Sequence, residues 1–314
     1  MNYQIQGLSI HAEVHGTAEP ALVFLHYWGG TSRNWRKVTA ELEGQFKTVA
    51  YDARGWGKSD KTLAGYKLAD LADEALALVK ALGIKQYVLV GHSMGGKVAQ
   101  LAASRRPEGL SGLILVAPAQ PTPRRNSEEM RQEQLHAYDN RENVLKTIGS
   151  GRLTARPPSP EILEQIVEDS MSGSHEATMA FPMESILEDI SAEVANINVP
   201  TVLLAGELDQ VASIERHKTE VLAYLPNAEF KIIKGSGHLI PIDEPRELAK
   251  KIASFMGGLL LSRNNALQRT FTSTTPVAFL AGMQFGDDTY DSLVILPPRG
   301  KLRTRRKRSR SYLP

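Results

Sequence analysis

Short apolar stretches alternate with amphipathic stretches through the first 256 residues of the chain. Residues 8–15 alternate apolar and polar side chains, which is typical of an antiparallel strand with one exposed face. The other stretches are short and almost wholly apolar, which is typical of strands buried on both faces of a sheet. They comprise residues 21–25, 46–51, 87–90, 113–117, 201–205 and 230–233.

Amphipathic helices are predicted between these strands. Residues 68–82 place apolar side chains on a single stripe (Leu68, Leu71, Ala72, Ala75, Leu78, Val79 and Leu82) and are followed by Gly83, a residue typical of helix ends. Residues 96–104 and 246–255 are further candidates. Repeated strand–helix–strand units predict an α/β fold, with a mostly parallel, twisted sheet and helices on both of its faces.

Residues 120–198 interrupt this alternation. They show no strand pattern and are rich in polar helix-formers at residues 127–138, 141–148, 159–170 and 175–190. The segment far exceeds the connection of about 2–6 residues that usually links a strand to a helix. We expect a helical cap over one end of the sheet, and the alternative is a set of surface helices unrelated to any site.

The expected organisation is therefore a core, a cap and an extension. Residues 1–119 and 199–256 form the core, residues 120–198 form the helical cap, and residues 257–314 form a poorly ordered C-terminal extension. Within that extension, eight of the twelve residues 299–310 are Lys or Arg. A basic run of this kind is either a solvated tail or a nuclear-localisation or nucleic-acid patch.

Composition narrows the class of protein. A chain of 314 residues with 42% hydrophobic side chains can bury a large core. Residues 257–314 carry ten Lys or Arg and three Asp or Glu, so the overall net charge of +2 leaves −5 on residues 1–256. This mildly acidic body gives no reason to expect nucleic acid as a partner of the core.

Compartment signals are few. The chain has no cysteine, which excludes disulfides, thiolate nucleophiles and Cys-ligated metals and fits a reducing compartment. Residues 1–6 lack the basic and apolar regions of a secretory signal, and no apolar run approaches the roughly 20 residues that span a bilayer. We expect a soluble, cytoplasmic protein with no membrane partner.

The clearest chemical signal is Gly-His-Ser-Met-Gly at residues 91–95, a G-x-S-x-G pattern between a predicted strand and a predicted helix beginning at Gly95 or Gly96. Such a turn is sharp and strained, so the positions two before and two after the serine must be small. Gly91 and Gly95 supply that room, and the helix N-terminus favours developing negative charge. We expect Ser93 to be a nucleophile; a serine that merely caps a helix is the alternative.

A serine nucleophile needs a base and a carboxylate that orients it. Among the eight histidines, His238 follows a predicted strand through a short Gly/Ser loop, at the sheet edge where catalytic groups gather. Asp209 lies just past another strand and is the expected acid, with Glu207 as the local alternative. Ser93, Asp209 and His238 follow one another in the chain order nucleophile, acid, base, which is the order typical of folds that carry the serine on a strand-to-helix turn.

An oxyanion hole needs two backbone N–H groups that point at the developing negative charge. We assign one to Met94, which directly follows the nucleophile, and the other to Trp28 in the glycine-containing loop after residues 21–25. His26 in the same loop is expected to hold the loop in place.

With these motifs the chain resembles the α/β-hydrolase superfamily, in particular the branch of esterases, non-haem haloperoxidase-like enzymes and C–C bond hydrolases. The resemblance covers roughly residues 3–256. It implies a Ser93–Asp209–His238 triad, no metal and no cofactor; we also find no H-E-x-x-H, Rossmann or P-loop pattern. The matching segments are residues 26–30, 52–60, 91–96, 206–209 and 235–238, of which 52–60 is interpreted as architectural.

Two positions refine this resemblance. Tyr27 stands where the superfamily usually has glycine before the oxyanion residue, so its side chain either fits a compatible backbone or reshapes the hole. Members that open epoxides or remove halide usually carry aspartate at the nucleophile position, so Ser93 argues against both reactions.

The expected function is hydrolysis of a small-molecule carboxylic ester through an acyl-enzyme. Lactonase, haloperoxidase-like perhydrolase and C–C hydrolase activities would use the same residues and remain alternatives. A small-molecule receptor with a slow triad is a further alternative, from a different class of protein. The sequence leaves the substrate and the oligomeric state open.

Overall fold

The computed structural model describes residues 1–273 of the chain. The expected disorder of the remaining C-terminal residues, and the basic run at 299–310, therefore lie outside the described residues. Residues Met1–Arg263 form one compact unit, and the chain from Asn264 belongs to a second. None of the helices within residues 1–273 is both long and apolar enough to cross a membrane.

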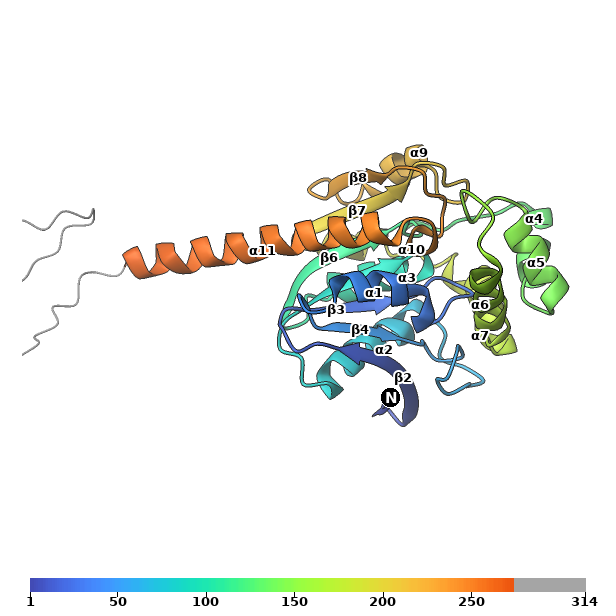
Figure 1. Ribbon diagram of the computed structural model, residues 1–314, viewed down its shortest axis with the longest axis horizontal. Helices are drawn as coiled ribbons and strands as arrows, with labels where there is room; N and C mark the ends of the chain where they lie inside the picture. The colour runs from blue at the N-terminus through green and yellow to red at the C-terminus, as the bar shows by residue number, and fades with distance from the viewer. Residues whose placement is uncertain (274–314) are drawn as a thin grey trace, which may run out of the picture. The chain divides into compact units, whose positions relative to one another are not determined.

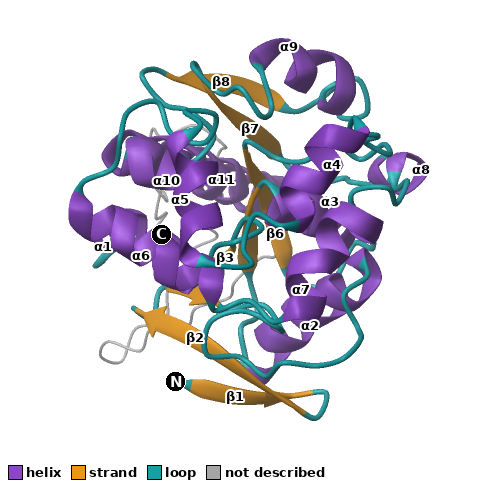
Figure 2. Ribbon diagram, turned by 90° about the vertical axis from the view of Figure 1, so that its right-hand side faces the viewer, coloured by secondary structure: helices purple, strands orange, loops and turns teal. Residues whose placement is uncertain are grey.

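One eight-stranded sheet runs through the first unit in the order β1-β2-β4-β3-β5-β6-β7-β8 (Figure 2). β1 pairs with β2, and β2 with β4, in antiparallel fashion, and all other neighbours are parallel. The predicted α/β fold and the antiparallel strand at residues 8–15 are thus confirmed. The strands are β1 (Asn2–Ile5), β2 (Leu8–His15), β3 (Ala21–Leu25), β4 (Thr48–Tyr51), β5 (Tyr87–His92), β6 (Leu110–Val116), β7 (Thr201–Gly206) and β8 (Glu229–Ile233).

Helices cover both faces of the sheet (Figure 2). The leucine stripe of α2 (Leu68–Ala81) and the small side chains of α3 (Met94–Ser104) join one apolar cluster with alternate residues of the strands. α1 (Arg36–Leu42) and the first turns of α11 (Pro245–Ser273) join a second cluster on the opposite face. The five residues of β3 are all buried, as a strand covered on both faces must be.

Residues 120–198, here called the helical insertion, lie between β6 and β7. Its elements are α4 (Glu128–Leu135), α5 (Arg141–Gly149), α6 (Pro160–Met171), α7 (His175–Ala180), the π-helical turn η2 (Phe181–Ser185) and α8 (Ser191–Val194). Helices α4 to α7 lie at one end of the sheet (Figure 1), whereas α8 packs against α3. The remaining short elements are η1 (Ser32–Trp35), α9 (Ile214–Arg216), η3 (His217–Val221) and α10 (Ile240–Asp243).

The structure differs from the predicted elements in several places, of which four concern whole elements or ends displaced by many residues. β1 and α1 were not predicted, because only one residue of β1 and two of α1 are buried and neither leaves a clear apolar pattern. Residues 175–190 form α7 and η2 instead of one helix, and a proline lies in the first turn of η2. α11 does not end at residue 255, because glycines 257 and 258 are accommodated inside the helix.

Candidate active site

The turn between β5 and α3 carries Ser93. Its backbone has φ 52° and ψ −113°, a conformation that L-residues rarely adopt. The turn is tightly packed, because a Cβ at Gly95 would lie 2.6 Å from the carbonyl oxygens of both Leu25 and His26. Ser93 is therefore held in a strained turn at the N-terminus of α3 and remains partly exposed.

Two loops bring an imidazole and a carboxylate to this serine. His238, in the loop after β8, places Nε2 2.9 Å from Ser93 Oγ. Its Nδ1 lies 2.8 Å from Oδ2 of Asp209, in the loop after β7. His238 and Asp209 are 3% and 5% exposed, so water cannot compete freely for these contacts. The structure thus joins residues 93, 209 and 238 in one chain of hydrogen bonds.

Asp209 is held as an ionised acceptor. Burial by itself raises the pKa of Asp209, but the charge and hydrogen bond of His238 outweigh that effect, so the pKa lies below its ordinary value. The backbone amides of Val211 and Ala212 also donate to Oδ1, at 2.7 and 2.9 Å. An ionised Asp209 accepts a hydrogen bond from the N–H at Nδ1 of His238, which leaves Nε2 free to accept from the hydroxyl of Ser93.

Glu207, the alternative carboxylate, has a different place. Its side chain is exposed, and Oε2 accepts a hydrogen bond of 2.9 Å from the amide of Gly235. Glu207 therefore holds the loop that precedes His238, whereas Asp209 contacts the imidazole itself.

The two amides assigned to the oxyanion hole belong to neighbouring segments. Trp28 and Met94 pack in one apolar cluster with Phe181 and Ile186 of the helical insertion. Within residues 1–273, neither backbone N–H donates to another protein group. The indole of Trp28 donates to the carbonyl of Thr178 at 3.0 Å, which fixes this loop to α7.

His26 and Tyr27 shape the loop after β3. His26 is buried and bridges two segments, because Nδ1 donates to the carbonyl of Tyr27 at 2.8 Å and Nε2 accepts from the amide of Ala53 at 3.1 Å. Tyr27 has no left-handed φ, so its backbone does not require glycine. Its ring packs against Gly30, where a Cβ would lie 2.5 Å from the ring, and joins an apolar cluster with α5 and α6.

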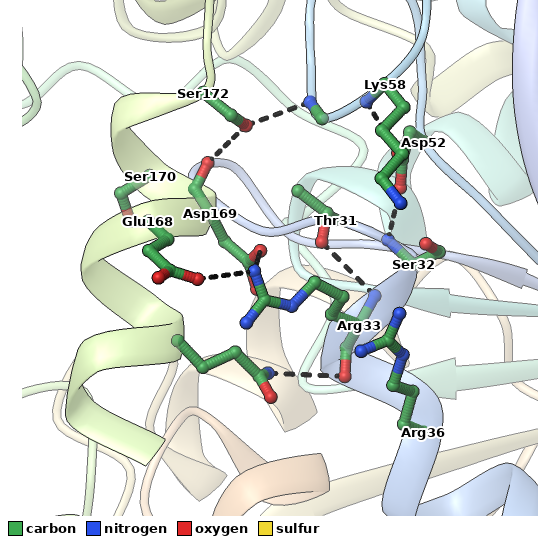
Figure 3. Close-up of polar contacts among 12 residues, drawn as sticks. Thr31, Ser32, Arg33, Arg36, Asp52, Lys58, Glu168, Asp169, Ser170 and Ser172 are labelled. Carbon is green, nitrogen blue, oxygen red and sulfur yellow. Dashed lines mark hydrogen bonds and ion pairs between the residues drawn. The ribbon is translucent and has the colours of Figure 1, made fainter. Parts of the chain in front are cut away.

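Helix α6 forms ion pairs with Arg33, which follows the loop after β3 (Figure 3). Arg33 Nη1 lies 2.8 Å from Glu168 Oε2 and 3.3 Å from Asp169 Oδ1. On the other side of the loop, Asp52 accepts from the amide of Ser32 at 2.7 Å. Burial raises the pKa of Asp169 to about 6 and outweighs the opposing effect of Arg33. The helical insertion is thus tied to the segment that supplies Trp28.

His92 was not singled out from the sequence, since it occupies a variable position of the G-x-S-x-G pattern. It is buried, and Nε2 donates to the backbone carbonyl of His238 at 2.9 Å. Burial, with a smaller effect from His238, lowers the pKa of His92 to about 3, so its imidazole is neutral at physiological pH. His92 therefore anchors the backbone of the residue that contacts Ser93.

Asp243 was also missed by sequence reasoning. Its Oδ2 accepts from the amide of Gly237 at 2.7 Å and from the amide of Ala155 at 2.9 Å. The amide of Leu239 donates to the carbonyl of Leu153 at 2.8 Å. The loop that carries His238 is therefore clamped to residues 153–155 of the helical insertion.

A cavity of about 750 Å³ opens at Ser93 and His238, within the range of about 300–1,000 Å³ usual for small-molecule sites. Its wall combines loops of the sheet with residues of the helical insertion, mainly from α4 and α5. No group of three or more His, Asp or Glu side chains within the described residues could hold a metal ion. The arrangement can activate a hydroxyl beside an apolar, ligand-sized space.

Known proteins share this architecture. The family described as alpha/beta hydrolase fold matches residues 20–245. A 3-oxoadipate enol-lactonase of Acinetobacter baylyi is 25% identical over 80% of this chain and 94% of its own length. A non-heme chloroperoxidase of Kitasatospora aureofaciens is 25% identical over 76% and 93%.

Solved structures of known proteins are also similar to this chain. A bacterial membrane phospholipase A is similar with a TM-score of 0.73 and 26% identity, over 82% of this chain and 86% of that chain. An esterase of Exiguobacterium antarcticum has a TM-score of 0.73 and 22% identity, over 81% and 98%, and is similar in fold.

Proposed function

Because the chain belongs to the alpha/beta hydrolase fold family, we propose that it is a serine hydrolase that cleaves a carboxylic ester of a small molecule through an acyl-enzyme. The observation that carries the proposal is the contact of 2.9 Å between Ser93 Oγ and His238 Nε2, at the wall of a ligand-sized cavity.

The first half of the reaction forms the acyl-enzyme. Ser93 Oγ attacks the carbonyl carbon of the ester while His238 Nε2 takes the hydroxyl proton. Asp209 keeps Nδ1 protonated and stabilises the imidazolium that forms. The carbonyl oxygen becomes an oxyanion that the amides of Trp28 and Met94 stabilise. The bond to the alcohol oxygen then breaks, and His238 returns its proton to that oxygen.

The second half repeats these steps with water. His238 accepts a proton from water, the resulting hydroxide attacks the acyl carbon, and the bond to Ser93 Oγ breaks. The proton on Nε2 returns to Ser93, and the carboxylic acid leaves. The helix N-terminus next to Ser93 favours the negative charge in both tetrahedral intermediates.

The test compares Ser93→Ala with wild type on p-nitrophenyl esters of increasing acyl length. Removal of the nucleophile should lower kcat by a factor on the order of 10⁶. Ser262→Ala, at an exposed position of α11, is the matched control and should keep wild-type rates. A fluorophosphonate probe should label wild type and not Ser93→Ala. Folded, active protein that resists the probe would overturn the proposal.

Lactone hydrolysis is the second candidate. A lactone is a cyclic ester, so the same steps apply and the released alcohol stays attached to the acid. It is favoured by the similarity to an enol-lactonase along 94% of that relative. A γ- and δ-lactone series, read by pH-indicator assay beside the ester panel, decides between the two by kcat/KM.

The remaining alternatives give other signatures. Perhydrolase activity would appear as peracid formation from acetate and hydrogen peroxide, measured by halide oxidation. C–C hydrolase activity would appear as cleavage of a vinylogous diketone. A receptor would release about one equivalent of p-nitrophenol and then stop.

A further inference from the structure

The wall of the active-site cavity contains a guanidinium without a carboxylate partner. Arg124 is half-buried; Nε donates to Asn126 Oδ1 at 2.9 Å, and Nη1 donates to the carbonyl of Val211 at 3.2 Å. Within residues 1–273, Nη2 has no protein acceptor, and this atom is not fully buried. One face of this cation is therefore open to a ligand.

Carboxylates near Arg124 already have other partners. Glu220 contacts Arg216 at 2.7 Å, and Asp209 contacts His238. Burial, with a smaller contribution from Arg216, lowers the pKa of Arg124 to about 10, so the group keeps its charge at neutral pH. The protein alone thus leaves this charge incompletely balanced in a partly desolvated place.

The rest of the cavity wall is also short of negative charge. Among the described residues that line it, the only acidic one is Glu133, which forms an ion pair of 2.8 Å with Arg152. Lys146 also lines the wall, and it has no ion pair within residues 1–273. The charges of Glu133 and Arg152 cancel, so two cations, Arg124 and Lys146, remain in the wall of the cavity that opens at Ser93 and His238.

Hydrogen bonds also connect Arg124 to the loop that carries Asp209 and to the segment beside Met94. Its side chain donates to the carbonyl of Val211, and the amide of Val211 donates to Asp209 Oδ1. Its own amide donates to the carbonyl of Ile186, which packs beside Met94. The guanidinium is thus fixed between the loop that carries Asp209 and the segment beside the assigned oxyanion amide, a rigid position suited to recognition.

We propose that Arg124 binds a carboxylate of the substrate, so that the enzyme prefers esters or lactones that carry a second, ionised carboxyl group. This inference rests on the proposed function, because it assigns a substrate class to the same cavity. A guanidinium presents paired N–H donors that match a carboxylate. An apolar wall with one such donor set orients the substrate relative to Ser93.

The test uses two pairs of substrates that differ in one charge. On the acyl side, the p-nitrophenyl monoester of glutaric acid is compared with p-nitrophenyl valerate. On the alcohol side, 4-acetoxybenzoate is compared with 4-methylphenyl acetate. The charged-to-neutral ratio of kcat/KM should fall by about 10- to 100-fold in Arg124→Gln for at least one pair, the size expected for loss of a hydrogen bond to a charged group.

The matched control is Arg125→Gln. Arg125 is exposed and does not line the cavity, so the same change of net charge should leave both ratios at their wild-type values. Arg124→Lys keeps the charge without the planar fork and should restore only part of the lost ratio. Equal ratios in wild type and Arg124→Gln for both pairs would overturn the inference.

A binding measurement separates this inference from the proposed function. Glutarate binding to Ser93→Ala, measured by calorimetry, needs no turnover. It should weaken at least tenfold in Ser93→Ala/Arg124→Gln. If glutarate binding depends on Arg124 but the wild-type protein hydrolyses neither the esters nor the lactones, the anion site stands and the proposed ester hydrolysis is rejected. If the wild-type protein hydrolyses esters but neither the rates nor glutarate binding depend on Arg124, the proposed function stands and the anion site is rejected.

Discussion

Gly95→Ala tests how closely the serine turn is packed against the central sheet. The new methyl carbon would lie 2.6 Å from the carbonyl oxygens of Leu25 and His26 and 2.7 Å from the carbonyl carbon of Leu25. All three are backbone atoms at the end of β3, which pairs on both sides with β4 and β5, so they have little freedom to move. The N-terminus of α3 must move instead.

The expected cost is that of forcing one methyl group into a packed core, about 1–3 kcal/mol in the free energy of unfolding. For a protein of this size, each kcal/mol corresponds to about 2–4 °C in Tm. Movement of α3 also displaces Ser93 and the amide of Met94, and a misplacement of about 1 Å can lower the rate by about 100-fold. Both stability and kcat should therefore fall.

Urea unfolding followed by circular dichroism gives the stability, and p-nitrophenyl acetate hydrolysis gives kcat. Gly258→Ala is the control, because a Cβ there meets no atom within 4 Å and the residue lies inside α11. Alanine at this helical position should stabilise by about 0.5–1 kcal/mol and leave kcat unchanged. Wild-type stability and kcat in Gly95→Ala would show that the turn can accommodate a methyl group, and the inference that Ser93 is rigidly held would be wrong.

Two further substitutions test the ties between the helical insertion and the site. Asp243→Ala should lower stability by about 1–3 kcal/mol and lower kcat more than it changes KM, because the acceptor of two loop amides is lost; Asp73→Ala, at an exposed position that loses only a surface ion pair with Arg105, should change stability by less than about 1 kcal/mol and leave kcat unchanged. An equal loss in both variants would contradict a positioning role. For Asp169, the pKa in the folded state is about 6, above the ordinary 3.8, so its contribution to stability is fully present below about pH 4 and is lost as the pH rises through 6. Asp169→Asn should lack this loss, so its Tm relative to wild type should rise between pH 4 and pH 7; a constant difference would contradict the raised pKa.

The fold could be predicted from the sequence wherever burial leaves a pattern. β2 and β3 begin and end at the predicted residues, because one alternates in burial and the other is fully apolar. β1 buries only Ile5 and left no pattern to recognise. α3 begins at Met94, one or two residues earlier than expected, because the left-handed backbone of Ser93 already ends the strand.

The motif residues of the candidate site could be predicted from the sequence, but the residues that support them could not. The motif, the chain order and the strand ends were enough to name Ser93, Asp209 and His238, which the structure joins by hydrogen bonds. Arg124 and Asp243 carry no comparable signal. Their positions depend on how the helical insertion folds back on the sheet, and contacts between segments so distant in sequence leave no local periodicity.

The path of the His238 loop explains why residues outside the catalytic motifs matter, Leu208 and His92 among them. β6 and β7 separate β5 from β8, so the base leaves its own strand about 14 Å from the strand of Ser93, at about 4.8 Å per neighbour. The five Cα–Cα steps from Ile233 to His238 span at most about 17 Å when fully extended, and a turn at residues 234–235 shortens this path, so the side chains of His238 and Ser93 must cover the remaining distance. The path of the loop across the sheet edge is held by Leu208, whose amide donates to Ser236 at 2.8 Å, and by His92, which holds the carbonyl of His238. A chain that kept the three motif residues but lost these supports would keep the sequence signature without the hydrogen bonds that join Ser93, His238 and Asp209.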